Sequence, residues 1–299
     1  MPIAELGRLD MGYEIDGPDD GEPLLLVMGL GTQLVGWPAE IVDGLATAGF
    51  RVVRIDNRDI GLSSRTPGPP PTRADLVRAF ARRPLEGPAY TIPDLAADAV
   101  ALLDHLGIER AHLVGASMGG MIVQQLAVDH PERALSLTSI MSNTGDRKHG
   151  RVTRRLLPTM ARSLTTPRPS DPEEAVRLGV EGWRVIAGPL FDEVEMESVV
   201  RVAVERSQSP YGGTRHLLAI LGSPDRTEGL ARLDLPTLVV HGLADPLVHH
   251  SGGIATARAV TGSRLLLFPD MGHDLPASRR EEIVEAITRT AERASRSAG

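Results

Sequence analysis

A strand, a sharp turn and a helix follow one another between residues 111 and 130, and this segment constrains the fold more than any other. Residues 111–114 form a short apolar run bounded by glycine, which predicts a buried strand. Apolar residues recur at helical spacing over 118–130, and Pro131 predicts the end of that helix. The pentapeptide between them, Gly-Ala-Ser-Met-Gly, matches the pattern Gly-x-Ser-x-Gly, with its serine at position 117.

The turn places strong demands on the backbone around Ser117. A chain that passes from strand to helix this sharply needs a strained conformation at the serine. It also needs small residues two positions before and after, here Gly115 and Gly119, so that strand and helix approach closely. The hydroxyl then lies at the carboxyl end of a strand, beside a helix N-terminus that favours developing negative charge. The alternative is a glycine-rich turn with an idle serine, but the flanking strand and helix favour a nucleophile.

Strand and helix signals alternate through most of the remaining chain. Apolar or alternating patterns predict strands at 3–15 (two strands and a turn), 23–28, 51–55, 135–141, 237–240 and 264–268. Helical spacing predicts helices at 38–48, 92–106, 254–260 and 278–294. This alternation implies right-handed crossovers, and therefore an α/β fold with a mostly parallel central sheet and helices on both faces. Ligands of such sheets bind outside the carboxyl ends of the strands.

Residues 146–228 break this alternation. They are rich in arginine, glutamate and proline, and they show helical patches at 151–162, 172–186, 192–207 and 213–221 without an evident buried strand. We therefore predict one discontinuous α/β core, residues 1–145 and 229–299, with 146–228 as a helical cap over one end of the sheet. The proline-rich connection 65–90, with a short helical piece at 74–82, is predicted to be the least ordered part of the chain.

Composition and charge exclude several classes of protein. The 299 residues include no cysteine, which excludes disulfides, thiolate zinc sites and a cysteine nucleophile. The net charge is -7 with both signs interspersed, which argues against a nucleic-acid partner. The N-terminus lacks a basic segment followed by an apolar core, so we expect no signal peptide, and no apolar run approaches the ~20 residues of a membrane span. We expect a cytoplasmic protein without membrane contact, present as a monomer or homodimer.

A serine hydroxyl needs a base that takes its proton, and the base needs a partner that orients it. His273 is the best candidate among the nine histidines, because it lies in the loop after the last predicted strand, at the carboxyl edge of the sheet. The alternative for His273 is a loop histidine beside a surface helix. His241 also lies at a strand end, but a buried structural role fits it better than catalysis.

The orienting acid is expected from another strand end. Asp245 is the first choice, because it follows the next-to-last predicted strand. Asp270 and Asp274 lie too near His273 along the chain to orient its ring easily. Asp146, after the preceding strand, is the remaining rival.

The oxyanion that forms during acyl transfer needs two preorganised N–H donors. One is expected from Met118, the residue after the serine, and the other from the loop after the strand 23–28, most simply from Leu30. Gly29 and Gly31 on its two sides give the backbone the freedom to aim this donor. Gly29 is also expected to contact the substrate.

These residues carry a resemblance to the α/β-hydrolase superfamily over essentially the whole chain. The order Ser117, Asp245, His273 matches the order of nucleophile, acid and base in that family. Residues 56–63 resemble a loop that many members write as Asp-x-Arg-Gly-x-Gly-x-Ser, with Asp59 where glycine is usual.

A narrower likeness lies in three short segments, residues 27–31, 36–38 and 57–59. They are similar to those of a bacterial branch that includes aclacinomycin methylesterase, an enzyme that cleaves a methyl ester on an aromatic polyketide. Met28 departs from the wider family, whose members often have histidine before the oxyanion glycine.

The resemblance implies an α/β-hydrolase fold with an inserted cap. It also implies a serine hydrolase that cleaves a carboxylic ester of a small-molecule substrate through an acyl-enzyme, with no metal and no organic cofactor. The serine argues against haloalkane dehalogenases and epoxide hydrolases, which use aspartate as the nucleophile. Lactonase, thioesterase, acyltransferase and cofactor-free perhydrolase activities use the same triad and stay open. A ligand-binding protein that kept the fold and lost the chemistry is a less favoured alternative.

Three aromatic residues of the predicted cap, Trp183, Phe191 and Tyr211, are candidates to roof an apolar pocket. Among them we expect Trp183 to contact the substrate. For each of the three, packing within the cap is an alternative of at least equal weight.

Overall fold

The computed structural model describes residues 1–81, 83, 90–157, 159, 169 and 171–297. These residues form an eight-stranded sheet in the order β1-β2-β4-β3-β5-β6-β7-β8. The strands are β1 Ile3–Glu5, β2 Asp10–Asp16, β3 Glu22–Val27, β4 Phe50–Ile55, β5 Ala111–Ala116, β6 Ala134–Ile140, β7 Thr237–Gly242 and β8 Arg264–Phe268. β2 pairs antiparallel with β1 and with β4, whereas the pairs from β4 to β8 are parallel.

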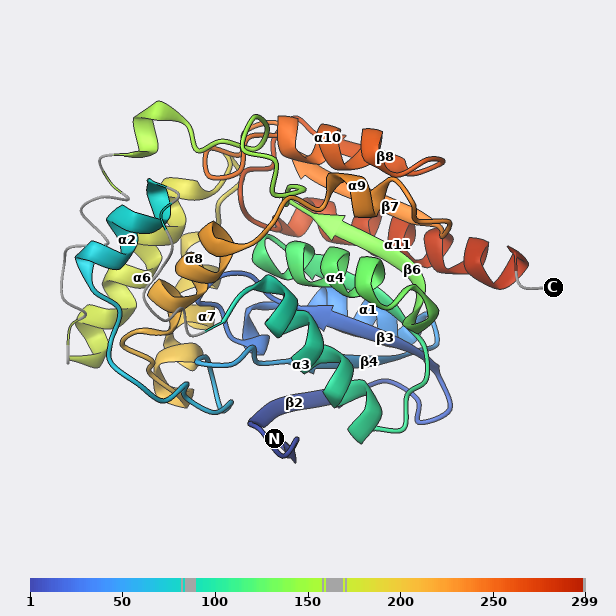
Figure 1. The fold of residues 1–299 in the computed structure, drawn as a ribbon, viewed down its shortest axis with the longest axis horizontal. Helices are drawn as coiled ribbons and strands as arrows, with labels where there is room; N and C mark the ends of the chain where they lie inside the picture. Colours follow the sequence, from blue (N-terminus) through green and yellow to red (C-terminus); the bar gives the residue numbers. More distant parts are fainter. Residues whose placement is uncertain (82, 84–89, 158, 160–168, 170, 298–299) are drawn as a thin grey trace.

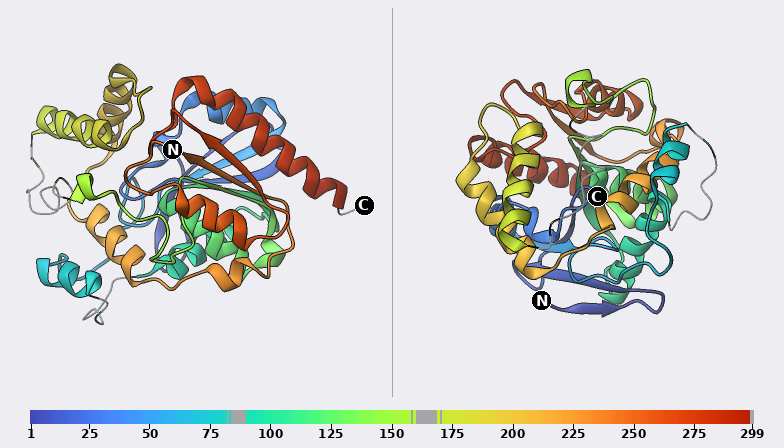
Figure 2. Two further views of the ribbon diagram at one scale, coloured as in Figure 1. Left: turned by 90° about the horizontal axis from the view of Figure 1, so that it is seen from above. Right: turned by 90° about the vertical axis from the view of Figure 1, so that its left-hand side faces the viewer.

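Helices cover both faces of the sheet (Figure 1). One face packs against α3 Ile92–His105, α4 Met118–Asp129 and α10 Ser251–Ala259, and the other packs against α1 Ala39–Thr47 and α11 Ala277–Ser297. The view from above in Figure 2 shows the strands between α11 and α4. The side chains of β3 join the two apolar cores alternately, because successive residues of a strand point to opposite faces. Its continuous apolar run is therefore buried on both sides.

The covering helices differ in how much of their surface they bury. α4 is buried on nearly all sides, since 10 of its 12 residues are buried. This helix follows Ser117, so the turn that holds the serine is fixed within the core. α11 instead buries a single stripe, Ile283, Ile287 and Ala291, whose four-residue spacing places them on one helical face.

A helical insertion lies between β6 and β7. It contains η3 Arg154–Leu156, α6 Pro172–Ile186, α7 Glu193–Arg206, α8 Gly212–Gly222 and α9 Thr227–Leu230. α6 and α7 pack together through three buried valines, with Trp183 and Phe191 against this cluster. Asp171 and Asp192 cap the two helices, each accepting a hydrogen bond from the backbone N–H three residues later. The insertion and α2 Arg73–Phe80 lie at the end of the sheet to which the arrowheads of β3 and β6 point in Figure 1.

The predicted architecture is confirmed: a mostly parallel central sheet, helices on both faces and a helical insertion after β6. Predicted and observed element ends differ by a few residues, which is ordinary for helix and strand boundaries. α9 and the turns η1 Leu34–Gly36 and η2 Pro131–Arg133 are too short to show a helical period in the sequence. The division into a core of 1–145 and 229–299 and a cap of 146–228 stays a prediction.

Parts of two predicted segments lie outside the described residues. They are residues 82 and 84–89 of the proline-rich connection, and 158 and 160–162 of the helical patch predicted at 151–162. None of the helices in the described ranges combines the length and the apolar character that a membrane span requires.

Candidate active site

Ser117 lies between β5 and α4 in a conformation that few residues adopt. Its φ is 55° and its ψ is -118°, a strained combination for a residue with a side chain. A Cβ atom on Gly119 would lie 1.9 Å from the Val27 carbonyl oxygen, and one on Gly115 would lie 2.2 Å from the Gly119 carbonyl oxygen. Both positions therefore need glycine, and the turn has the geometry that the sequence predicts.

Ser117, His273 and Asp245 are joined by two hydrogen bonds, although they come from three loops far apart in the chain. Ser117 Oγ lies 2.9 Å from His273 Nε2, and His273 Nδ1 lies 2.7 Å from Asp245 Oδ2. A carboxylate only accepts hydrogen bonds, so Nδ1 carries the hydrogen and Nε2 accepts the one from the serine hydroxyl. The structure thus brings together the three residues predicted as nucleophile, base and orienting acid.

Backbone and side-chain donors fix the Asp245 carboxylate. Its Oδ1 accepts hydrogen bonds from the backbone N–H groups of Leu247 and Val248, both at 2.8 Å. His241 Nε2 lies 3.5 Å from Asp245 Oδ2 and donates to the Val248 carbonyl at 2.7 Å. Burial by itself raises the pKa of Asp245, but the charge of His273 and hydrogen bonds from His241 and His273 hold that pKa below its usual value. Asp245 is therefore ionised at neutral pH, and His241 contacts its carboxylate without contacting the serine.

The rival acids have other partners. Asp146 Oδ2 lies 2.7 Å from His149 Nδ1. Asp270 pairs with Arg279 through two hydrogen bonds of 3.0 Å and 2.6 Å. Asp274 accepts hydrogen bonds from the backbone N–H groups of two glycines, at 3.0 Å and 2.9 Å. Within the described residues, Asp245 is the acid that contacts the predicted base.

The two predicted oxyanion donors lie next to the serine. Met118 is the first residue of α4, so its N–H has no partner inside the helix. Leu30 follows Gly29, where a Cβ atom would lie 3.0 Å from the Ser117 Cβ. Among the described residues neither amide donates a hydrogen bond, so both are free to meet a substrate oxygen. Their role as oxyanion donors stays a prediction.

Residues 28–34, which we call the oxyanion loop, are held by two side chains of the loop 56–63, to which our predictions from the sequence assign no role. Asn57 Nδ2 donates to the Met28 carbonyl at 3.1 Å. Asp56 Oδ1 accepts from the Leu34 N–H at 2.8 Å. Both side chains belong to the loop after β4, so that loop fixes both ends of the segment that carries Leu30.

His216, on α8 of the insertion, holds the middle of the same loop. Its Nδ1 lies 3.1 Å from the Gly31 nitrogen and accepts that N–H, so Nε2 carries the hydrogen and donates to the Arg58 carbonyl at 2.9 Å. Burial lowers the pKa of His216 to about 4, so the ring is neutral at neutral pH. Sequence reasoning missed this residue, because a lone histidine in a helical patch looks like any core histidine.

Asp59 shows how this chain accommodates an aspartate where the family usually has glycine. Its φ is 67°, in the left-handed region that favours glycine and that aspartate tolerates better than most residues. The carboxylate accepts hydrogen bonds from the Thr66 N–H and hydroxyl, both at 2.7 Å, and from Arg215 at 3.0 Å. These partners stabilise the turn and tie it to α8.

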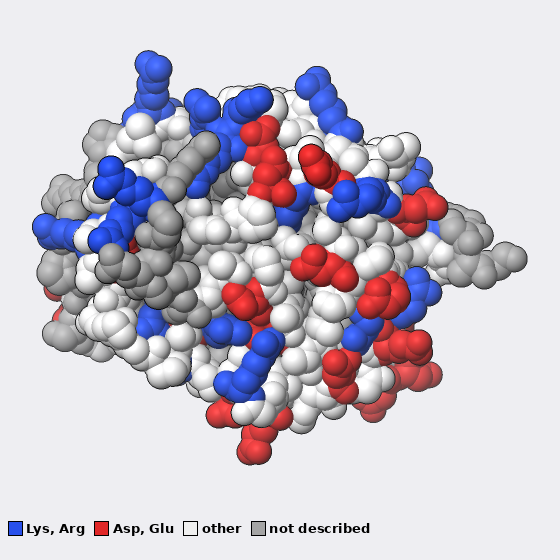
Figure 3. Space-filling model, in the orientation of Figure 1, with Lys and Arg blue, Asp and Glu red and all other residues white. Residues whose placement is uncertain are grey.

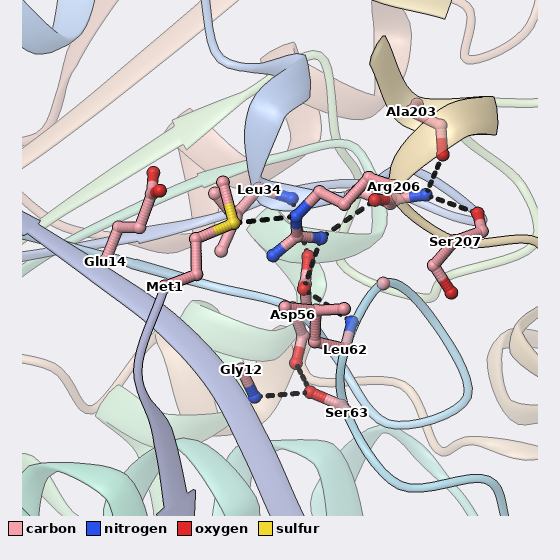
Figure 4. Close-up of polar contacts among 12 residues, drawn as sticks. Met1, Gly12, Glu14, Leu34, Asp56, Leu62, Ser63, Ala203, Arg206 and Ser207 are labelled. Carbon is pink, nitrogen blue, oxygen red and sulfur yellow. Dashed lines mark hydrogen bonds and ion pairs between the residues drawn. The ribbon is translucent and has the colours of Figure 1, made fainter.

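The end of α7 is joined to the oxyanion loop through Gln33, and to Asp56 of the loop after β4 through a buried ion pair (Figure 4). Gln33 Nε2 donates to the carbonyls of Ala203 and Ser207, at 2.7 Å and 2.8 Å. Arg206 donates to Gln33 Oε1 at 2.8 Å and pairs with Asp56 at 2.6 Å. The last carbonyls of α7 thereby find donors from the core, and the insertion is attached beside the serine.

A cavity of about 2190 Å³ lies in front of Ser117 and His273. Trp183, Phe191 and Tyr211 all line it, and the first two also pack against the α6–α7 cluster, so they combine both roles considered for them. Contact of Trp183 and Gly29 with a substrate stays a prediction. In the described ranges, no three or more His, Asp or Glu side chains are arranged to hold a metal ion.

The chain is similar to known proteins in sequence and in fold. The chain matches the family described as alpha/beta hydrolase fold over residues 22–277. It is 31% identical over 283 residues to rhodomycin D methylesterase DnrP of Streptomyces peucetius, with 89% of each chain covered. Rhodomycin D methylesterase DauP of Streptomyces sp. (strain C5) is 32% identical over 291 residues, with 91% of each chain covered. The crystal structure of the enol-lactonase from Burkholderia xenovorans LB400 has a TM-score of 0.71 and 23% identity, over 98% of this chain and 99% of that chain. The chain therefore belongs to the α/β-hydrolase family.

Proposed function

We propose that this protein is a serine hydrolase that cleaves a carboxylic ester, with Ser117 as nucleophile, His273 as general base and Asp245 as orienting acid. One observation carries the proposal: the chain of hydrogen bonds from Ser117 Oγ to Asp245, of 2.9 Å and 2.7 Å, which lies at a large cavity. A serine, an imidazole and a carboxylate in this order activate a hydroxyl for attack on a carbonyl.

The first half of the reaction acylates the serine. Ser117 Oγ attacks the ester carbonyl carbon while His273 Nε2 takes its proton, and the ionised Asp245 stabilises the imidazolium. The carbonyl oxygen becomes an oxyanion, which the amides of Leu30 and Met118 receive. When the tetrahedral intermediate collapses, the C–O bond to the alcohol breaks and His273 gives its proton to the leaving oxygen.

The second half releases the acid. A water molecule replaces the alcohol, His273 takes one of its protons, and the hydroxide oxygen attacks the acyl carbon. The bond to Ser117 Oγ then breaks, the serine recovers its proton from His273, and a carboxylic acid leaves. The same residues therefore act twice, and the reaction consumes only ester and water.

We further propose a methyl ester of a bulky, polyketide-like acid as the substrate. The two relatives named above, 31% and 32% identical to this chain, are rhodomycin D methylesterases. The cavity of about 2190 Å³ exceeds the roughly 300–1,000 Å³ of ordinary small-molecule sites, which suits a large acyl group. The same triad also suits hydrolysis of lactones and thioesters, and transfer of the acyl group to peroxide in place of water. These compounds are therefore tested beside the esters.

Burst kinetics with p-nitrophenyl esters from acetate to decanoate tests the proposal. We expect a burst of p-nitrophenol followed by steady turnover, because deacylation follows a separate acylation step. In Ser117→Ala both phases should vanish, with a loss on the order of 10⁶-fold in kcat and an unchanged melting temperature. Substantial turnover in that variant would remove Ser117 as the nucleophile. If a fluorophosphonate leaves Ser117 of the wild type unlabelled, the result would favour a ligand-binding protein. If Ser117 is labelled, kcat/KM values for bulky aromatic methyl esters, lactones and thioesters show which class of substrate the enzyme prefers.

A further inference from the structure

Four of the arginines that line the cavity have no salt-bridge partner among the described residues. Arg147 and Arg151 precede η3, Arg154 begins it, and Arg226 precedes α9, and all four line the cavity. Among the described residues no carboxylate forms a salt bridge with any of them. We call these four residues the basic wall. Figure 3 shows basic side chains gathered at the end of the molecule where Figure 1 places η3.

The acids that line the same cavity each already have a hydrogen-bond donor, and none of them forms a salt bridge with the basic wall among the described residues. The donors are Arg177 for Glu181, Arg280 for Glu195, and backbone N–H groups for Asp192 and Asp274. Within the described part of the chain, the cavity therefore presents carboxylates that are already hydrogen-bonded and guanidinium groups that have no salt bridge.

Arg226 is the buried member of the basic wall, and its guanidinium group is held in place by several hydrogen bonds. It is only 3% exposed, and its hydrogen bonds reach neutral acceptors alone: Gln124 Oε1 at 3.2 Å and the carbonyls of Asn143 at 3.1 Å and Pro224 at 3.4 Å. Burial lowers the pKa of Arg226 to about 10, so it keeps its charge at neutral pH. The adjacent Asp225 carboxylate is engaged by the N–H and hydroxyl two residues later. Asp225 acts on the Arg226 charge through space only, and a buried charge without an opposite charge in direct contact costs free energy, which an anion in the cavity would offset.

Two of the residues that bond to Arg226 belong to or follow elements next to Ser117. Gln124 belongs to α4, the helix that begins directly after Ser117, and Asn143 follows β6, the strand beside β5. Asn143 and Arg147 line the same cavity as the serine.

Within the described ranges, the side chains of Arg147 and Arg151 also bond only to neutral groups. Arg147 donates to the Leu221 carbonyl at 2.9 Å, and Arg151 donates to the Arg147 carbonyl at 2.6 Å. The Arg154 side chain makes no hydrogen bond among the described residues. The donors that remain on these forked groups suit the two oxygens of a carboxylate, which arginine binds through paired hydrogen bonds.

We propose that the basic wall binds an anionic group of the substrate, and that the natural substrate is an ester that also carries a carboxylate. This inference rests on the proposed ester hydrolysis and adds a requirement on the acyl part. The carboxylate lies against Arg226 and Arg151 while the ester carbonyl lies at Ser117. The exposed members of the basic wall, Arg151 and Arg154, also attract such an anion, and salt weakens that attraction.

A matched pair of esters tests this inference. The monoester of suberic acid with p-nitrophenol and p-nitrophenyl octanoate share leaving group and chain length, and differ only in a terminal carboxylate against a methyl group. We expect wild-type kcat/KM to favour the acidic ester, and the preference to shrink as salt is added. In Arg226→Gln the ratio of acidic to neutral kcat/KM should fall by about tenfold or more, since a charge-assisted hydrogen bond is lost. Arg226→Lys, which keeps the charge, should retain part of the preference.

Two further variants control for the change in net charge and for misfolding. Arg155 lies on η3 beside Arg154 but does not line the cavity, so Arg155→Gln removes the same charge and should leave the ratio unchanged. If Arg226→Gln melts well below the wild type, the double variant Arg151→Gln/Arg154→Gln at exposed positions carries the same expectation. An equal loss of preference in Arg155→Gln and in the double variant would reduce the effect to net charge and overturn the basic wall as a site.

Binding of suberate to Ser117→Ala, measured by calorimetry, separates the failure of this inference from failure of the proposed function. If suberate binds Ser117→Ala but does not bind the same protein with the arginine double substitution, the result supports the basic wall. This holds even if the wild type turns over no ester, although the hydrolase proposal would then be wrong. Neutral esters that are turned over without preference for the acidic one, and with no suberate binding, overturn this inference and leave the hydrolase proposal standing.

Discussion

Asp245 has two roles in the proposed mechanism: it orients the His273 ring through the 2.7 Å hydrogen bond, and its charge stabilises the imidazolium. Asp245→Asn keeps the shape of the side chain but removes the charge, and its amide can hold the ring in the wrong tautomer. We expect kcat to fall by about 10⁴-fold with little change in melting temperature. Steady-state kinetics with a p-nitrophenyl ester and a thermal melt measure the two effects.

Asp146→Asn is the matched control for this residue. Asp146 bonds to His149 and does not contact His273, so this variant should keep kcat close to that of the wild type. The opposite pattern, an active Asp245→Asn and an inactive Asp146→Asn, would show that the acid has been misassigned.

At the scale of elements, a helix of the insertion supports a loop of the core through one neutral imidazole. His216 on α8 accepts the Gly31 N–H of the oxyanion loop, and it can do so only while Nδ1 is unprotonated. The groups that face the ring are Arg58, Asp59 and Tyr90. Burial is the largest influence on this ring; the charge of Asp59 raises its pKa and that of Arg58 lowers it, and the pKa of His216 lies at about 4 instead of 6.5.

This shift predicts how the stability of the fold depends on pH. Between pH 6.5 and about 4, the unfolded chain binds a proton at His216 that the folded chain does not. Where the unfolded state binds more protons than the folded state, lowering the pH favours unfolding. The free energy of unfolding therefore decreases as the pH falls from 6.5 to about 4. His216→Asn, which does not titrate, should lose less over the same range. Urea titrations in steps across the window measure the difference, and identical losses in both proteins would mean that His216 does not contribute.

At the scale of the whole molecule, the insertion and the sheet are joined by the ion pair of Arg206 and Asp56. Both side chains are buried, at 8% and 0% exposed, and Asp56 also holds the oxyanion loop. Arg206→Met would leave a buried carboxylate without its guanidinium, which we expect to lower the free energy of unfolding by about 3–5 kcal/mol. Urea denaturation measures this loss, and adding Asp56→Asn to the same chain should recover part of it because the charge is then gone.

Arg201→Gln is the control on the same helix. Arg201 pairs with Glu173 and Glu197 on the exposed side of α7, where solvent screens the charges, so this variant should melt close to the wild type. If Arg206→Met is no less stable than Arg201→Gln, the ion pair does not join the two parts of the molecule.

The sequence by itself determined the features that depend on local chemistry. Gly115 and Gly119 around Ser117 marked the turn, because only glycine permits the close approach that the structure shows there. His273 and Asp245 could be predicted from their places after strands, because parallel strands end at one edge of a sheet and bring distant loops together.

Only the tertiary structure decided which side chains support the site and what charge the cavity presents. His216 meets Gly31 across 185 positions of the chain, and Arg226 meets Gln124 across 102. Hydrophobic periodicity records that a residue is buried, but not which neighbour it finds, so nothing local distinguishes these residues from ordinary core or surface ones. Partner choice over such distances follows from how the insertion packs on the sheet, which is a property of the whole fold.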